Sequence, residues 1–143
     1  MMDEMTNRPG LPEELRIAVA RLSRRLRNQG NGRLSFTQYA ALAVLDKHGE
    51  MTPRELADHE KVQPPSMTRT VAALELEGLV VRSPHPTDGR QVVLVATDSG
   101  RALLAEHRRL KEAWLWQRLQ SLTEREREIL EAATPILEKL SRS

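Results

Sequence analysis

The most constraining feature of this sequence is a change of pattern at Gly78. Before it, residues 63–77 carry apolar side chains at three- and four-residue spacing, which predicts a helix with one buried face. After it, two β-branched runs at 80–82 and 91–96 flank a loop of turn-forming residues, which predicts an antiparallel hairpin. The chain is therefore expected to fold around a short helix that leads directly into a hairpin.

Further helices are predicted on both sides of this unit. Apolar spacing and helix-boundary residues occur at three places in the preceding chain, over about residues 12–28, 36–48 and 53–59. After the hairpin, Thr97 or Ser99 can cap a long helix, and Thr123 can cap a final one. The fold class expected from these patterns is mainly α with a small β-hairpin.

A tight turn at residues 60–62 joins the predicted helices at 53–59 and 63–77. Two short helices that meet across such a turn have the spacing of a helix-turn-helix. With 143 residues, the chain can bury one sizeable core but is too short for two independent domains. The first helical segment and the last two hold more leucine than a small winged unit can cover, so a partner surface is expected.

Composition excludes several classes of protein. The chain has no cysteine, which rules out disulfides, thiolate metal sites and thiol-based redox sensing. No apolar stretch reaches the ~20 residues that a bilayer span needs, and the first residues lack a signal-peptide pattern, so a cytoplasmic protein without membrane contact is expected. Six arginines and no acid lie between Arg16 and Arg33. That run is either a solvated helix face or a phosphate-facing one.

The exposed face of the helix at 63–77 suits close approach to a DNA groove. Successive helical residues lie ~100° apart, so the face opposite the buried stripe includes Pro65, Ser66 and Arg69 together with small alanines. Arg69 could donate two hydrogen bonds to a guanine, and Ser66 could bond a base or a phosphate. An ordinary surface helix with one exposed arginine explains the same pattern, so the helix alone leaves both interpretations open.

The hairpin loop adds a second basic residue in a favourable place. We expect Asp88 to hold the guanidinium of Arg90, which follows two residues later at the loop tip. A guanidinium oriented in this way is suited to a narrow minor groove, where the negative potential is strongest. An Asp-Gly turn with a flanking arginine is usually structural when it occurs alone. A groove-sized helix followed by a basic hairpin indicates a module that binds duplex DNA.

Several segments closely resemble the MarR family of bacterial transcriptional regulators. They are residues 65–71, 74–82, 88–90, 95–100 and 122–126. The helix at 65–71 is similar to that of the SlyA-like members, and the resemblance extends over about residues 11–140. Two positions depart from the family pattern: Gly89 stands where many relatives carry a second basic residue, and Ala96 replaces a frequent leucine. The glycine at position 89 lowers the positive charge of the hairpin loop.

The resemblance implies a winged helix-turn-helix with a helical dimerisation region, all within a single domain over 1–143. Residues 34–97 would bind DNA, and residues 11–30 and 98–141 would join two copies into a homodimer. Each subunit would then offer one winged helix-turn-helix to half of a palindromic operator, as a repressor or, alternatively, an activator. The residues expected to contact DNA are Arg54, Pro65, Ser66, Thr68, Arg69, Asp88 and Arg90.

The same resemblance implies a crevice between the helical body and the winged part. A small aromatic or phenolic anion could bind there and change the spacing of the two DNA-binding helices. Arg16 and Arg24 are arginines near that junction, and Tyr39 offers a ring on which a ligand could stack. A structural role fits these three residues equally well. No cofactor is expected.

Three other classes of function are less consistent with the sequence. Histidines 48, 59, 85 and 107 form no His-x-x-x-His pair, so a metal-responsive winged-helix regulator would need distant acids to complete a site. An enzyme is not expected, because the chain has no glycine-rich phosphate loop, no Gly-x-Ser-x-Gly turn and no Cys/His pair. A helical scaffold that binds only proteins explains the leucine-rich ends but leaves Arg69 and Arg90 without a role.

Overall fold

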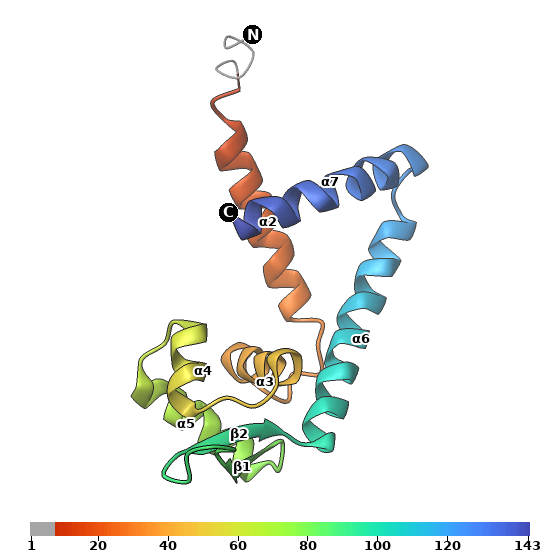
Figure 1. Ribbon diagram of the computed structural model, residues 1–143. Coiled ribbons are helices and arrows are strands. Elements are labelled where there is room, and N and C mark those ends of the chain that lie inside the picture. The colour runs from red at the N-terminus through yellow and green to blue at the C-terminus, as the bar shows by residue number, and fades with distance from the viewer. Residues whose placement is uncertain (1–7) are drawn as a thin grey trace.

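The computed structural model describes residues 8–143 and is mainly α-helical, with one small hairpin (Figure 1). This confirms the expected fold class. In chain order the elements are α2 (Leu11–Arg27), α3 (Phe36–His48), α4 (Pro53–Glu60), α5 (Pro64–Leu76), β1 (Val80–Pro84), β2 (Val92–Ala96), α6 (Asp98–Gln120) and α7 (Glu124–Arg142). The helices lie within one or two residues of their predicted bounds, whereas β1 is two residues longer than predicted.

Side-chain caps set the beginnings of several helices. The hydroxyl of Ser35 accepts a hydrogen bond from the backbone of Gln38, and the Gln38 side chain accepts one from the backbone of Ser35, at 3.2 and 2.9 Å. This reciprocal pair is a capping box, and Thr123 forms a second one at the start of α7. Of the two predicted caps for α6, the structure selects Thr97.

The core lies between α3, α4, α5, the hairpin and the first turns of α6. Its largest fully buried side chains are Leu42, Leu56, Met67, Leu74, Leu79, Leu94, Val71 and Val80. The predicted buried stripe of α5 is confirmed, because three of these residues belong to it. Each such side chain contributes about 1.5–3 kcal/mol of transfer free energy. The burial of this stripe holds the opposite face of α5 outward.

The turn between α4 and α5 fixes the angle at which α5 is presented. Lys61 adopts a left-handed backbone with φ of 54°, and the N–H of Val62 donates to the carbonyl of Ala57 at 3.0 Å. This is the six-to-one hydrogen bond of a Schellman motif, which satisfies a carbonyl at the end of α4. The tight turn predicted between the two helices is therefore present.

The hairpin is longer and better anchored than its sequence indicates. Val80 pairs with Ala96 and Pro84 with Val92, and residues 85–91, here called the wing loop, connect the strands. Leu94 also exchanges backbone hydrogen bonds with Met51 at 2.7 and 3.3 Å. This bridge ties β2 to the segment between α3 and α4. A single bridged residue carries no alternating pattern, so the sequence did not predict it.

The remaining helices extend away from this core, and α7 turns back from the far end of α6 (Figure 1). Neither α2 nor α7 contains a buried residue. Their exposed apolar side chains are Leu11, Leu15, Val19, Leu22, Ile129, Leu130, Ile136, Leu137 and Leu140. The surface expected to need a partner is therefore present on these two helices. Within residues 8–143, no helix combines the length and the apolar character needed to cross a membrane.

Candidate nucleic-acid interface

Ser66 and Arg69 lie together on the outward face of α5. One terminal nitrogen of the Arg69 guanidinium is 3.4 Å from the Ser66 hydroxyl oxygen, so the two groups are presented side by side. They line a groove of about 520 Å³ between the starts of α3 and α5, together with Thr37, Gln38, Val62, Gln63 and Thr70. The sequence did not place Thr37 and Gln38 on this surface, because local periodicity does not show that α3 begins beside α5.

The first turn of α5 offers DNA few free donors. Pro64 and Pro65 have no backbone N–H, so this helix start presents fewer amides to a phosphate than most helices do. The Thr68 hydroxyl donates to the carbonyl of Pro64 at 2.9 Å. Its hydrogen is thus already used, and Thr68 can contact DNA only as an acceptor or through its methyl group. Charged contacts to phosphates must come from side chains elsewhere.

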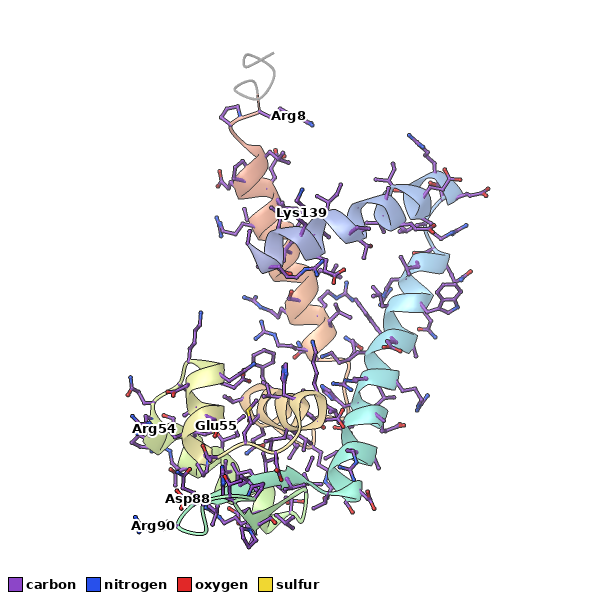
Figure 2. The ribbon with its side chains drawn as sticks, viewed as in Figure 1. Arg8, Arg54, Glu55, Asp88, Arg90 and Lys139 are labelled. Atoms are coloured by element: carbon purple, nitrogen blue, oxygen red, sulfur yellow. The ribbon has the colours of Figure 1, made fainter. Side chains whose placement is uncertain are left out.

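Arg54 supplies one such side chain from the first turn of α4. It is exposed and lines a shallow pocket of about 420 Å³ together with Pro53, Pro64, Met67 and Thr68. Arg54 therefore lies on the same side of the molecule as the start of α5. Figure 2 shows it at the same end as Asp88 and Arg90, which is the end opposite to α2 and α7.

The wing loop is held by hydrogen bonds to its own backbone. One carboxylate oxygen of Asp88 accepts from the N–H of Arg90 at 3.1 Å, and the other accepts from the Gln91 side-chain amide at 3.2 Å. The ring of His85 accepts from the N–H groups of Thr87 and Asp88 at 3.2 and 3.0 Å. Asp88 thus orients the main chain of Arg90 rather than its guanidinium, which corrects the expected pairing. The exposed guanidinium extends from a preformed loop.

Comparison with known proteins identifies this arrangement. Residues 34–92 match the MarR family. Over 128 residues the chain is 44% identical to an uncharacterised HTH-type transcriptional regulator of Mycobacterium bovis, covering 89% of this chain and 90% of that protein. The chain belongs to the MarR family. Its members and the relatives found here are transcriptional regulators rather than enzymes, which confirms the expected class of function.

Two further relatives support this assignment of the MarR-family chain. A crystal structure of a transcriptional regulator from Pseudomonas aeruginosa matches with a TM-score of 0.84 at 33% identity, over 93% of this chain and 95% of that one. The HTH-type transcriptional repressor MdtR of Bacillus subtilis is 33% identical over 96 residues, which are 67% of this chain and 61% of MdtR. The winged helix-turn-helix fold is therefore confirmed, and α5 is the second helix of its helix-turn-helix, the position of the recognition helix in this motif.

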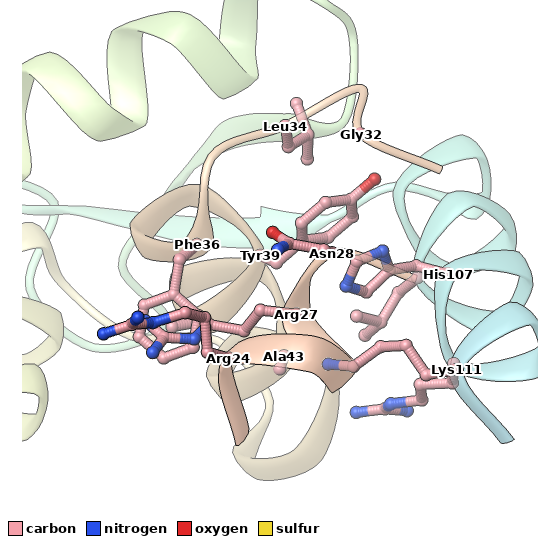
Figure 3. A pocket seen from close by; sticks show the side chains of 13 residues that line it. Arg24, Arg27, Asn28, Gly32, Leu34, Phe36, Tyr39, Ala43, His107 and Lys111 are labelled. Carbon is pink, nitrogen blue, oxygen red and sulfur yellow. The ribbon is translucent and has the colours of Figure 1, made fainter. Parts of the chain in front are cut away.

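A second feature of this MarR-family fold is a cavity of about 790 Å³ at the junction of α2, α3 and α6 (Figure 3). Four cationic side chains line it, from Arg24, Arg27, Arg108 and Lys111. Among the described residues, no acidic side chain lines it. Arg27 also lies over the ring of Phe36, with 5.0 Å between the guanidinium carbon and the ring centroid. The cavity is thus suited to an anion that carries an apolar or aromatic part.

Two of the three predicted ligand-binding residues, Arg24 and Tyr39, line this cavity. Arg16 lies two turns earlier on α2, about 12 Å away along the helix axis, and does not line it. The most informative residue was not predicted: His107 stacks on Tyr39 with 3.6 Å between ring centroids and 11° between planes. The two residues are 68 positions apart, so no local pattern could have paired them.

Both stacked rings are neutral near pH 7. Burial raises the pKa of the Tyr39 phenol, with smaller opposing contributions from the backbone of Leu34 and from Arg33. Burial also lowers the pKa of His107, and the positive charges of Lys111 and Arg108 lower it further. The wall of the cavity is therefore an uncharged aromatic pair surrounded by cations.

The structure also brings together two histidines that the sequence left apart. The rings of His48 and His59 have centroids 5.0 Å apart at the ends of α3 and α4. Within residues 8–143, no group of three or more His, Cys, Asp or Glu side chains could hold a metal ion. The pair therefore remains a contact between two helix ends.

Proposed function

We propose that this MarR-family chain is a cytoplasmic repressor that binds a palindromic operator as a homodimer. The observation that carries the proposal is that Arg54 and the wing loop lie at one end of the molecule (Figure 2), where α5 presents Ser66 and Arg69 on its outward face, with uncovered apolar faces of α2 and α7 at the other end. Repression rather than activation is supported by the relative MdtR, which is named a repressor. A dimer seated on a promoter would exclude other proteins from it.

The homodimer would be joined by residues 11–30 and 98–141, while residues 34–97 bind DNA. The apolar side chains of α7 occur on one helical stripe, and Ile136 is 60% exposed in the single chain. Exposed stripes of this kind are covered in a stable protein, and a second copy carries the same stripe. Two half-sites one helical turn apart, ~34–36 Å, also require two linked recognition helices.

Within each half-site, Arg69 would donate two hydrogen bonds to a guanine in the major groove, with Ser66 as its neighbour. Arg90 would enter the minor groove from the wing loop, and Arg54 would neutralise a phosphate. Pro65 and Thr68 would contact the groove through apolar groups. Asp88 would act indirectly, because its carboxylate is committed to the backbone of the wing loop.

The test is to select the operator from a random DNA pool and compare variants on it at fixed salt. Arg69→Ala should weaken specific binding by ~1–3 kcal/mol and relax the preference at one base pair per half-site. Arg90→Ala should weaken binding with a milder change in sequence preference. Arg109→Ala, on the exposed side of α6, is the matched control and should bind normally. Equal losses on operator and random DNA for Arg69→Ala would contradict its role as a base contact.

We also propose that the cavity binds a small aromatic or phenolic anion that releases the DNA. The support is the aromatic wall of Tyr39 and His107 beside Arg24 and three further cations. To shift a dimer from 1:99 to 99:1, the ligand must prefer the non-binding spacing by about 5.5 kcal/mol. Salicylate and similar anions should be titrated into the operator complex, with Arg24→Ala as the variant that responds less. If none releases DNA below millimolar concentrations, protein level alone controls the operator.

A further inference from the structure

The imidazole ring of His107 is packed in its neutral form at the junction between α6 and the winged part (Figure 3). It is 7% exposed, and one face of its ring lies against Tyr39. Its Nδ1 atom is buried and has no hydrogen-bond partner among the described residues. In the neutral ring, this atom can carry a lone pair, which needs no acceptor. A proton at Nδ1 would create a buried N–H without one.

The loop between α2 and α3 closes directly over this ring. A Cβ atom added to Gly30 would lie 2.0 Å from Cε1 and 2.1 Å from Nδ1 of His107, so only glycine fits there. The next residue, Asn31, accepts a hydrogen bond from the Tyr39 hydroxyl. Gly30 and Asn31 therefore hold the loop against both members of the aromatic stack. Gly30 therefore lies directly beside Nδ1.

The same loop is tied to the recognition helix. Two residues after Asn31, the guanidinium of Arg33 pairs with the carboxylate of Glu77 at 2.9 Å. Glu77 is the C-cap residue that directly follows α5. Residues 30–33 thus contact the His107 and Tyr39 stack at one side and the end of the recognition helix at the other. A movement of the loop would act on the helix that contacts DNA.

The charges around His107 oppose its protonation. Arg24 and Arg27 approach the cavity from α2, and Arg108 and Lys111 approach it from α6 itself. From α3, the facing titratable group is the neutral phenol of Tyr39. Gly30 and Asn31 of the loop are uncharged. The carboxylate of Asp46 on α3 forms an ion pair with Arg108, with 3.5 Å between the guanidinium nitrogen and the carboxylate oxygen. An imidazolium at this position would thus be a fifth cation without a facing carboxylate.

We propose that His107 is a pH-sensitive latch: its protonation breaks the stack on Tyr39, displaces residues 30–33 and loosens the alignment of α5, so that operator affinity falls in mild acid. The latch is distinct from an effector, because it needs no ligand in the cavity. Its effect on DNA rests on the proposed function, whereas its effect on folding does not.

The direction of the pH effect follows from the pKa of His107, which burial lowers first and the charges of Lys111 and Arg108 lower further. The unfolded chain takes up the proton near its ordinary pKa of about 6.5, and the folded chain only at lower pH. The stability that His107 contributes is therefore present above pH ~6.5 and is lost as the pH falls towards its folded pKa. The loss cannot exceed about tenfold in the folding constant per pH unit for one proton.

The first experiment uses the protein without DNA. An NMR titration of the His107 ring should give a pKa below about 6.5, with the Tyr39 ring signals shifting in the same transition.

Thermal unfolding should then be compared between the wild type and His107→Phe, which keeps a flat ring but cannot be protonated. The two profiles should run parallel above pH 7 and diverge below 6.5. His85→Gln, in the wing loop, is the control for another histidine. A His107 that titrates at or above its ordinary pKa would overturn the proposal.

The second experiment measures binding to the selected operator between pH 7.5 and 5.5 at fixed salt. The wild type should lose about threefold to tenfold more affinity per pH unit below 6.5 than His107→Phe. Identical profiles with a normal NMR transition would overturn the coupling between the latch and α5. Absence of operator binding at every pH would instead contradict the proposed function, and the titration and unfolding results would still decide whether His107 is a latch.

Discussion

The winged part and the two outer helices of this chain are both rich in leucine, but only the winged part buries its own apolar side chains. Helices α3 to α5, the hairpin and the start of α6 enclose a core in which Leu42, Leu56, Leu74 and Leu94 are inaccessible to solvent. Helices α2 and α7 bury none of theirs. The difference teaches that one region is complete as a single chain, whereas the other leaves an apolar surface uncovered, which the proposed homodimer would bury.

The physical reason is the order in which the elements follow one another. Short connections let α3, α4, α5 and the hairpin cover each other's apolar faces within one chain. Among the described elements, α2 comes first and α7 last; α2 reaches the winged part where Arg27 lies over Phe36 of α3, and α7 follows α6. An isolated helix is marginal in water, so packing against a second copy in the proposed homodimer would stabilise these helices.

The largest expected effect comes from removing the unpartnered surface. Truncation after Ser121 deletes α7 and with it five exposed apolar side chains. The truncated chain should lose the dimer and tight operator binding while its winged core still folds. Sedimentation and operator titration measure the two effects. A soluble truncated monomer with unchanged operator affinity would refute the assignment of α7 to the dimer interface.

Single substitutions should destabilise the two regions in different ways. Leu42→Ala removes a side chain with 0% exposure and should lower the free energy of unfolding by about 2–5 kcal/mol at every protein concentration. Leu137→Ala on α7 weakens association, so it should instead lower the melting temperature only at concentrations at which the wild type is dimeric. Melting curves over a hundredfold range of concentration distinguish the two. If the melting temperatures of both variants depend on concentration in the same way, the proposed difference between the two regions is wrong.

The junction between the regions should be sensitive to one added methyl group. Gly30→Ala would bring Cβ within 2.0 Å of the His107 ring, so the stack or the loop must move. We expect a loss of about 1–3 kcal/mol in the free energy of unfolding. Gly89→Ala is the control, because no atom lies within 4 Å of its added Cβ. Denaturant melts of both variants test this, and a smaller loss for Gly30→Ala than for its control would contradict the close packing.

The smallest expected effect concerns the tie between the loop and α5. Arg33→Gln removes an ion pair whose two side chains are both about half exposed, and should change stability by only about 0–1 kcal/mol. Its effect on operator affinity should be larger than its effect on stability, because it frees the end of α5. Arg125→Gln, which breaks an exposed pair within α7, is the matched control. Equal affinities for these two variants would show that the tie does not position α5.

Much of the DNA-binding surface was predictable because it is encoded locally. The helical stripe of Met67, Val71 and Leu74 determines which face of α5 is buried, and so places Arg69 outward. Ser35 with Gln38 marks the start of α3, and turn residues mark the wing loop. Each of these features depends on residues within about two helical turns of one another, which is the range over which periodicity and caps act.

Tertiary structure alone decided the contacts between distant segments. The stack of Tyr39 on His107, the bridge between Met51 and Leu94 and the tie of Arg33 to Glu77 each join residues more than 40 positions apart. Such pairings depend on how whole elements pack, and local patterns carry no information on that packing. The sequence by itself therefore determined the elements and the exposed face of α5, whereas the folded chain determined the cavity, the stack of His107 on Tyr39 and the junction.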